Sequence, residues 1–226
     1  MAKRPLFVPR GLVVLASIWI FLSWVSLFGF HPPVQPQAAS YAPSIQLLMM
    51  LIGIGIAIGW PLLRLSARPS SMPTAQAALD GLSIFVLFQV VVWPLRLVTN
   101  WTIARAVAVD ASIASAIMLT AAILSITQGS CSPRTRAGGM LAAVVLVLAP
   151  LAIGARASDS SWGRMLTAPS APALIARCAE PSTIDPSQPD RGLLFRAYAL
   201  ASAAWAVALG VHALGPSAKS RVSPAN

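Results

Sequence analysis

The sequence predicts an all-α protein, a polytopic transmembrane helical bundle of about six spans. Its composition is the first observation: 57% of the 226 residues are hydrophobic and 10% are charged, whereas soluble domains carry about 25% charged residues. The second observation is that the apolar residues gather into stretches of about 20, the helix length that crosses a hydrocarbon core roughly 30 Å thick. The mean hydropathy of +0.74 agrees with a core that is shared with lipid.

These stretches form one membrane domain, 11–214, between a cytoplasmic segment, 1–10, and a cytoplasmic tail, 215–226, that we expect to be disordered. The outer loops at 31–43 and 156–192 contain several prolines, which exclude a continuous helix. We interpret both loops as connectors, with a docking surface for an outside partner as the alternative. The predicted spans are 11–30, 44–63, 81–98, 103–126, 138–154 and 193–214.

The first span has some features of a secretory signal. Lys3, Arg4 and Arg10 make a positive start, and the small residues at 37–40 offer a cleavage site. The apolar run at 11–30 exceeds the roughly 7 to 15 residues of a signal peptide, which favours a retained anchor. Cleavage is the alternative, and it would leave five spans with the amino terminus outside.

Cations lie at alternate ends of the spans, which predicts the orientation of the chain. Short loops rich in Lys and Arg stay cytoplasmic, and loop 31–43 has none. The connection at 99–102 is also uncharged, although Arg96 and Arg105 flank it within the helices. Both termini are therefore predicted to be cytoplasmic, and we expect the membrane to be a bacterial cytoplasmic (inner) membrane. The cations assigned to the cytoplasmic side are Lys3, Arg4, Arg10, Arg64, Arg68, Arg134, Arg136, Lys219 and Arg221.

Small residues in two spans predict close contact between helices. Gly55 and Gly59 are four residues apart in the second span, a spacing that lets a neighbouring helix approach. The glycines of 53–59 superficially resemble a dinucleotide-binding loop, but that motif needs a preceding strand, which a membrane span does not provide. The fourth span carries a similar stripe, formed by Ala104, Ala108 and Ser112.

Two polar features flank the third span. Asp80 is expected to cap its cytoplasmic start, where a carboxylate can accept hydrogen bonds from unpaired amides. Gln89, in mid-span, is expected to hydrogen-bond across helices. Farther along the chain, the segment 173–179 in the second outer loop could form a short helical turn lying on the membrane surface.

Asp110 is the most unusual residue of the sequence because it lies inside the fourth span, where an uncompensated carboxylate is costly. Arg105 is five residues earlier and therefore roughly 140° around the helix, which makes it a poor partner. Arg96 and Arg196 approach the same leaflet from neighbouring spans and are better placed. We interpret Asp110 as part of a structural ion pair between helices, with a proton or ion relay as the alternative.

The sequence predicts no catalytic, cofactor-binding or metal site. His31 and His212 have no other histidine near them in sequence, and the predicted topology separates Cys131 from Cys178 across the membrane. We therefore expect a protein that is not an enzyme and that has no cofactor. The net charge of +10 is explained by cations beside membrane spans, so no nucleic-acid partner is expected.

The functional hypothesis that needs the fewest special residues is a non-enzymatic subunit or accessory component of a larger membrane assembly. Its partners would be the lipid bilayer and other proteins, in the membrane or at the outer loops. A transport protein, such as the membrane half of an ATPase-driven exporter, is the alternative. An intramembrane enzyme ranks last, since no acid, base or metal ligands converge.

Overall fold

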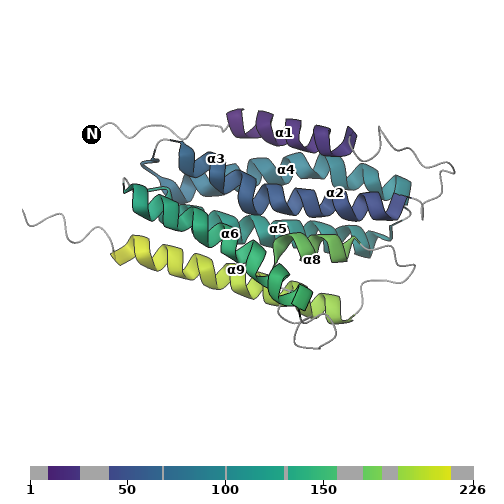
Figure 1. Ribbon diagram of the computed structural model, residues 1–226. Helices are drawn as coiled ribbons and strands as arrows, with labels where there is room; N and C mark the ends of the chain where they lie inside the picture. The colour runs from purple at the N-terminus through teal and green to yellow at the C-terminus, as the bar shows by residue number, and fades with distance from the viewer. Residues whose placement is uncertain are drawn as a thin grey trace, which may run out of the picture.

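The computed structural model describes residues 10–25, 41–67, 69–99, 101–129, 132–156, 170–179 and 188–214. Throughout these residues the chain forms helices and short connections, with no strand. The helices are α1 (Arg10–Trp24), α2 (Ala42–Ile54), η3 (Gly55–Gly59), α3 (Trp60–Ser66), α4 (Pro73–Thr99), α5 (Ile103–Thr127), α6 (Pro133–Arg156), α8 (Ala171–Cys178) and α9 (Gln188–Leu214) (Figure 1). Of these, η3 is a π-helical turn that joins α2 and α3 into one continuous helix.

The long helices run side by side, with α5 at the centre of the bundle (Figure 1). Its most extensive contacts are with α4 and α9, and it also touches α6 and α8. The most apolar 18-residue window of α5 is 61% buried, whereas the corresponding window of α9 is 11% buried. α1 packs against α2 and α4 at one edge of the bundle, and α9 packs against α5 at the other.

Four helices are long and apolar enough to cross a membrane: Ala42–Ser66, Pro73–Arg96, Ile103–Thr127 and Arg191–Ala213. They correspond to the second, third, fourth and sixth predicted spans. Their outer faces expose large apolar side chains, including Val90 at 70% and Phe195 at 76%. Lipid solvates such faces and water does not. The prediction of an all-helical membrane protein is therefore confirmed, with four helices of membrane-spanning length among the described residues.

The first and fifth predicted spans correspond to α1 and α6, which are not among those four helices. α1 has 15 residues, and the end of the predicted span at Phe30 lies outside the described residues. α6 has 24 residues, but its side chains are described only as far as Leu146. The cytoplasmic segment at 1–9 and the tail at 215–226 likewise lie outside the described part of the chain.

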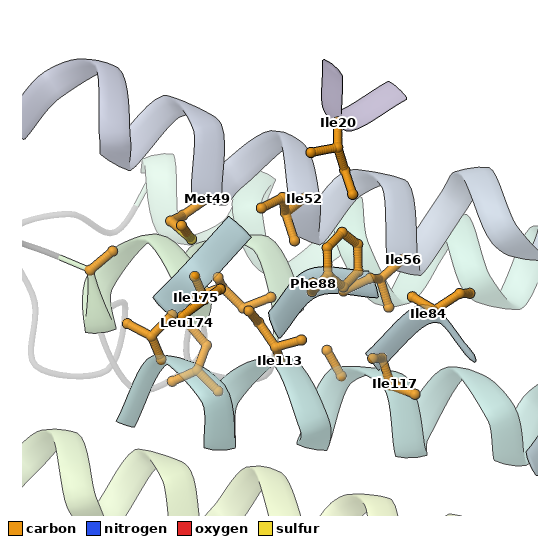
Figure 2. Packing of buried hydrophobic residues seen from close by; sticks show 14 of the residues in the cluster. Ile20, Met49, Ile52, Ile56, Ile84, Phe88, Ile113, Ile117, Leu174 and Ile175 are labelled. Carbon is orange, nitrogen blue, oxygen red and sulfur yellow. The ribbon is translucent and has the colours of Figure 1, made fainter. Parts of the chain in front are cut away.

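The core of the bundle is built mainly from isoleucines and leucines, with smaller numbers of alanines, valines and aromatic residues. Ile113 and Ile117 of α5 face Ile84 and Phe88 of α4, as Figure 2 shows. Ile52 and Ile56 of the α2–η3 helix, Ile20 of α1, and Leu174 and Ile175 of α8 complete the same cluster. The cluster therefore joins five helical segments into one packed body.

Asp80 does not cap a helix, contrary to the sequence-based expectation. α4 begins at Pro73, two turns before Asp80, because proline suits the first position of a helix, where no hydrogen bond from its nitrogen is needed. The side chain of Asp80 is fully buried instead. A fully buried carboxylate needs partners from elsewhere in the fold.

The short helix α8 is buried, which corrects the expectation of a turn at 173–179 on the membrane surface. Leu174 and Ile175 are 4% and 0% exposed, and α8 packs mainly against α2 and α5. The Ser170 hydroxyl caps it by accepting a hydrogen bond from the Ala173 amide at 3.3 Å. The apolar face of α8 is thus part of the protein core.

Candidate functional site

Asp110 lies on α5, roughly 10 Å along the helix from its first residue, at 1.5 Å per residue. Gln89 and Trp93 of α4 and Tyr198 of α9 lie close enough to act on its carboxylate. Oδ1 of Asp110 and Nε2 of Gln89 are both buried, and neither makes a hydrogen bond of normal geometry among the described residues. The Trp93 indole donates to Gln89 Oε1 at 2.7 Å. We refer to these four residues as the Asp110 cluster.

The arginines named as partners of Asp110 are engaged or located elsewhere. Nε of Arg96 donates to the Trp101 carbonyl oxygen at 3.4 Å, and Arg196 is exposed on α9. Nη1 of Arg105 donates to the Cys178 carbonyl oxygen at 3.2 Å. In the part of the chain that the structure describes, Asp110 forms no ion pair.

The position of Arg105 has a physical explanation. It is buried, with 4% of its surface exposed, and it reaches the carboxyl end of α8. Helix carbonyl ends carry partial negative charge, which favours a buried arginine at this position. Arg105 therefore attaches α8 to α5, a role that the spacing of charged residues in the sequence does not indicate.

Asp110 has no cation beside it among the described residues, and this determines what chemistry its carboxyl group can perform. A carboxyl group inside a membrane span is stable when protonated, when paired, or when it faces a polar cavity. Here its described neighbours are an amide, an indole and a phenol, which offer hydrogen bonds but no full charge. Such a group is suited to taking up and releasing a proton.

A second polar cluster joins α3 to α4. Arg64 Nε donates to Asp80 Oδ2 at 2.5 Å, Arg64 Nη2 donates to Oδ1 at 3.0 Å, and Gln76 Nε2 donates to Oδ1 at 2.8 Å. The side chain of Arg64 is 20% exposed and that of Asp80 is 0% exposed. Sequence reasoning missed this cluster, although both charged residues had been placed at the cytoplasmic ends of consecutive antiparallel spans. Their common position at the cytoplasmic ends of neighbouring spans was the feature of the sequence that could have predicted this ion pair.

Only some of the small residues that were predicted to allow close helix contact lie at a contact between helices. A Cβ atom on Gly55 would lie 3.0 Å from Trp19 Nε1, so this glycine lets α1 approach, whereas a Cβ on Gly59 would meet nothing within 4 Å. On α5, Ala108 and Ser112 are buried and Ala104 is exposed. A tighter contact occurs at Gly53, where a Cβ would lie 2.5 Å from Pro172 Cα.

The histidines and cysteines do not form a site in the described structure. His212 Nε2 lies 2.9 Å from the Ser125 carbonyl oxygen, and Cys178 is buried without a disulfide, while His31 and Cys131 lie outside the described residues. Within the described ranges, no three His, Cys, Asp or Glu side chains gather into a possible metal site.

Fold and clusters together define the class: an all-α membrane protein with polar groups inside its bundle. No protein-family profile matches the chain, and no curated protein or solved structure is significantly similar to it.

Proposed function

We propose that the protein is a non-enzymatic subunit of a larger membrane assembly, and that α9 provides its main contact with a partner helix. The observation that carries this proposal is the outer face of α9. This helix is 11% buried in its apolar window, against 33% to 61% for the other three membrane-length helices. Of these four helices, α9 therefore leaves the largest share of its apolar window uncovered by the described part of the chain.

α9 is attached to the bundle along one face. The Trp205 indole donates to the Met118 carbonyl oxygen at 2.9 Å, and His212 contacts the Ser125 carbonyl oxygen, both on α5. Ala201 and Ala208 are completely buried on the same face.

A second face of α9 is rich in small exposed residues. At 100° per residue, Ala199, Ser202, Ala203 and Ala206 lie on one arc of the helix, roughly 100° wide, and all four are exposed. Ser202 and Ala206 are four residues apart, as are Ala199 and Ala203. This spacing lets two backbones come close in a membrane, where packing rather than the hydrophobic effect drives association. The arrangement supports a partner helix on this arc.

Affinity purification in mild detergent from the native membrane, followed by mass spectrometry, tests the proposal. We expect a stoichiometric membrane partner that is lost with Ala206→Phe, because the larger side chain separates the helices. Val211→Phe is the matched control, since Val211 is also exposed but lies on another face of α9. A monodisperse wild-type protein that purifies without a partner would contradict the proposal.

The proposal includes six spans with both termini in the cytoplasm of a bacterium. α6, with 24 residues, is about 36 Å long at 1.5 Å per residue and so has the length of a span. Single cysteines at Ser71 and Thr102, in a background that lacks Cys131 and Cys178, test the orientation with a maleimide that does not cross membranes. Labelling of intact spheroplasts at Thr102 and not at Ser71 is expected; the reverse pattern would invert the topology.

Transport is the second candidate function, and the Asp110 cluster is the observation that favours it. The exporter version has less support: α3 ends at Ser66 and α4 begins at Pro73, while α5 ends at Thr127 and α6 begins at Pro133. These short connections leave little room for a cytoplasmic helix that would receive an ATPase. A carrier that moves protons through Asp110 predicts that Asp110→Asn abolishes proton flux into proteoliposomes, measured with a trapped pH-sensitive dye, while Arg196→Gln does not.

A further inference from the structure

An apolar cavity of about 400 Å³ lies between α1, the continuous α2–η3–α3 helix and α4. This volume is in the range of about 300 to 1,000 Å³ that is typical of ligand sites. α1 contributes Leu12 and Trp19, the continuous helix contributes Gly59 and Leu63, and α4 contributes Phe88. The cavity is separate from the Asp110 cluster and from the small-residue arc of α9.

The shape of the cavity depends on the π-helical turn. Both Gly55 and Gly59 line it, and neither has a side chain to fill it. The Trp19 indole crosses from α1 and donates to the Leu51 carbonyl oxygen at 3.2 Å, which holds α1 against the turn. Single π-helical turns inside α-helices occur frequently at functional sites. Here the turn lies in the wall of the cavity.

The surroundings of the cavity identify its occupant as hydrocarbon. Its lining consists of aliphatic residues, glycines, two tryptophans and Phe88, and apolar cavities of this kind exclude water. Leu15, Leu62 and Leu63 line the cavity and are also 43% to 46% exposed, so the cavity opens to the outer surface of the bundle. In a membrane that surface meets acyl chains.

Two arginines are close in sequence to residues that line the cavity. Arg10 precedes the lining residue Leu12 by two positions, and Arg64 directly follows the lining residue Leu63. Arg10 is exposed, and the Arg64 side chain, which binds Asp80, is 20% exposed. α1 begins at Arg10, α3 ends at Ser66, and the start of α1 lies near α3 in Figure 1, so both arginines belong to helix ends at the same end of the bundle. Guanidinium groups bind phosphate through hydrogen bonds, and the bonds from Arg64 to Asp80 use its Nε and Nη2 groups, so Nη1 is the Arg64 donor that we assign to a phosphate.

We propose that this cavity binds one acyl chain of an anionic phospholipid, whose headgroup lies at Arg10 and Arg64. The acyl chain fills the space between α1 and α4 that the described side chains leave open. The lipid thereby adds to the contacts that α1 makes with α2 and α4, which among the described residues are fewer than those between α4 and α5.

Native mass spectrometry tests this inference on the full-length protein, extracted in mild detergent from vesicles that contain equal amounts of phosphatidylglycerol and phosphatidylcholine. We expect one retained phosphatidylglycerol on each wild-type chain. Gly59→Phe should reduce the retained lipid about tenfold, which is about 1.4 kcal/mol of binding free energy. A side chain at Gly59 meets no other atom within 4 Å of its Cβ, so the substitution fills the cavity without a clash at the backbone.

Gly210→Phe is the matched control, because Gly210 is also in a membrane-length helix with nothing within 4 Å of an added Cβ, but it lies on α9 away from the cavity. It should retain the lipid. Ala16→Phe fills the cavity from α1 and provides a second blocking variant if Gly59→Phe does not fold. Arg10→Gln should abolish the preference for phosphatidylglycerol over phosphatidylcholine.

The inference is overturned if the wild-type protein retains no phospholipid, or if the folded blocking variants retain as much as Gly210→Phe. Equal retention of the two phospholipids by the wild-type protein would overturn the anionic headgroup. Loss of the lipid in all variants, including Gly210→Phe, would show that binding does not depend on this cavity and would also overturn the inference.

Discussion

Arg64 and Asp80 join α3 to α4 through two hydrogen bonds, from Nε to Oδ2 at 2.5 Å and from Nη2 to Oδ1 at 3.0 Å. Gln76, one turn before Asp80 on the same helix, donates a third hydrogen bond to this carboxylate at 2.8 Å. The connection between the two helices is only residues 67–72. The pair therefore closes a tight antiparallel helical hairpin near one end of the bundle.

Breaking this pair from either side is expected to destabilise the protein. Arg64→Gln should lower the free energy of unfolding by about 3 to 5 kcal/mol, because it leaves the fully buried Asp80 uncompensated, and Asp80→Asn should lower it by less, because Arg64 is partly exposed. The double variant Arg64→Met/Asp80→Leu should lose less than the sum of the single changes. Unfolding in mixed micelles, followed by circular dichroism, measures these values.

Arg134→Gln is the control for this experiment, since Arg134 is exposed at the start of α6 and should change stability by less than about 0.5 kcal/mol. If Arg64→Gln behaves like this surface control, the pair contributes little to the fold.

Asp110→Asn should leave the stability of the protein unchanged or raise it. The described structure shows no ion pair for this substitution to break, and an amide placed beside Gln89 can both donate and accept hydrogen bonds. Arg196→Gln, on the exposed face of α9, should likewise be neutral. If instead each variant lowers the free energy of unfolding by about 3 to 5 kcal/mol, and the two losses are not additive in the double variant, Asp110 and Arg196 form an ion pair after all.

Gly53→Ala should loosen α8, because the added methyl group would lie 2.5 Å from Pro172 Cα, a backbone atom. Overpacking of this kind costs about 1 to 3 kcal/mol. Cys178, which is 3% exposed on α8, should then react faster with a maleimide in a Cys131→Ser background. Gly59→Ala, which meets no atom within 4 Å, should instead stabilise its helix by roughly 0.5 to 1 kcal/mol. Equal labelling of Cys178 in both variants would show that α8 tolerates the displacement.

Trp205→Phe should weaken the attachment of α9 to α5. The substitution keeps an aromatic ring but removes the hydrogen bond to the Met118 carbonyl oxygen, at a cost of about 0.5 to 1.5 kcal/mol. Phe195→Leu is a suitable control, because Phe195 is 76% exposed on the same helix. Unfolding in micelles compares the two, and an equal effect would mean that the Trp205 hydrogen bond does not hold α9.

Much of the fold was predictable because the signal for a membrane span lies within one continuous stretch of the sequence. A run of about 20 apolar residues has to be helical in a bilayer, since its backbone groups find no other partners. The helices at Ala42–Ser66 and Ile103–Thr127 therefore match their predicted spans closely. The start of α4 was predicted eight residues too late, because the polar residues before Asp80 were taken to lie outside the span.

The candidate sites were less predictable, because charged partners are chosen by three-dimensional packing. Spacing along the sequence showed that Arg105 does not face Asp110, but it did not show that α8 folds back into the bundle and receives Arg105 at its carboxyl end. Likewise, Asp80 has the sequence position of a cap and the structural environment of a buried ion pair.

By itself, then, the sequence determined that this is an apolar, all-helical membrane protein. The reason is that each apolar residue adds to the preference of its stretch for lipid over water, whatever the rest of the fold does. Which side chains meet was decided by the tertiary structure alone. Gly53 and Gly59 are six residues apart in one helix, yet one touches Pro172 and the other borders an open cavity. The physical reason is that contact depends on which helix arrives at each face, and that depends on the packing of the whole bundle.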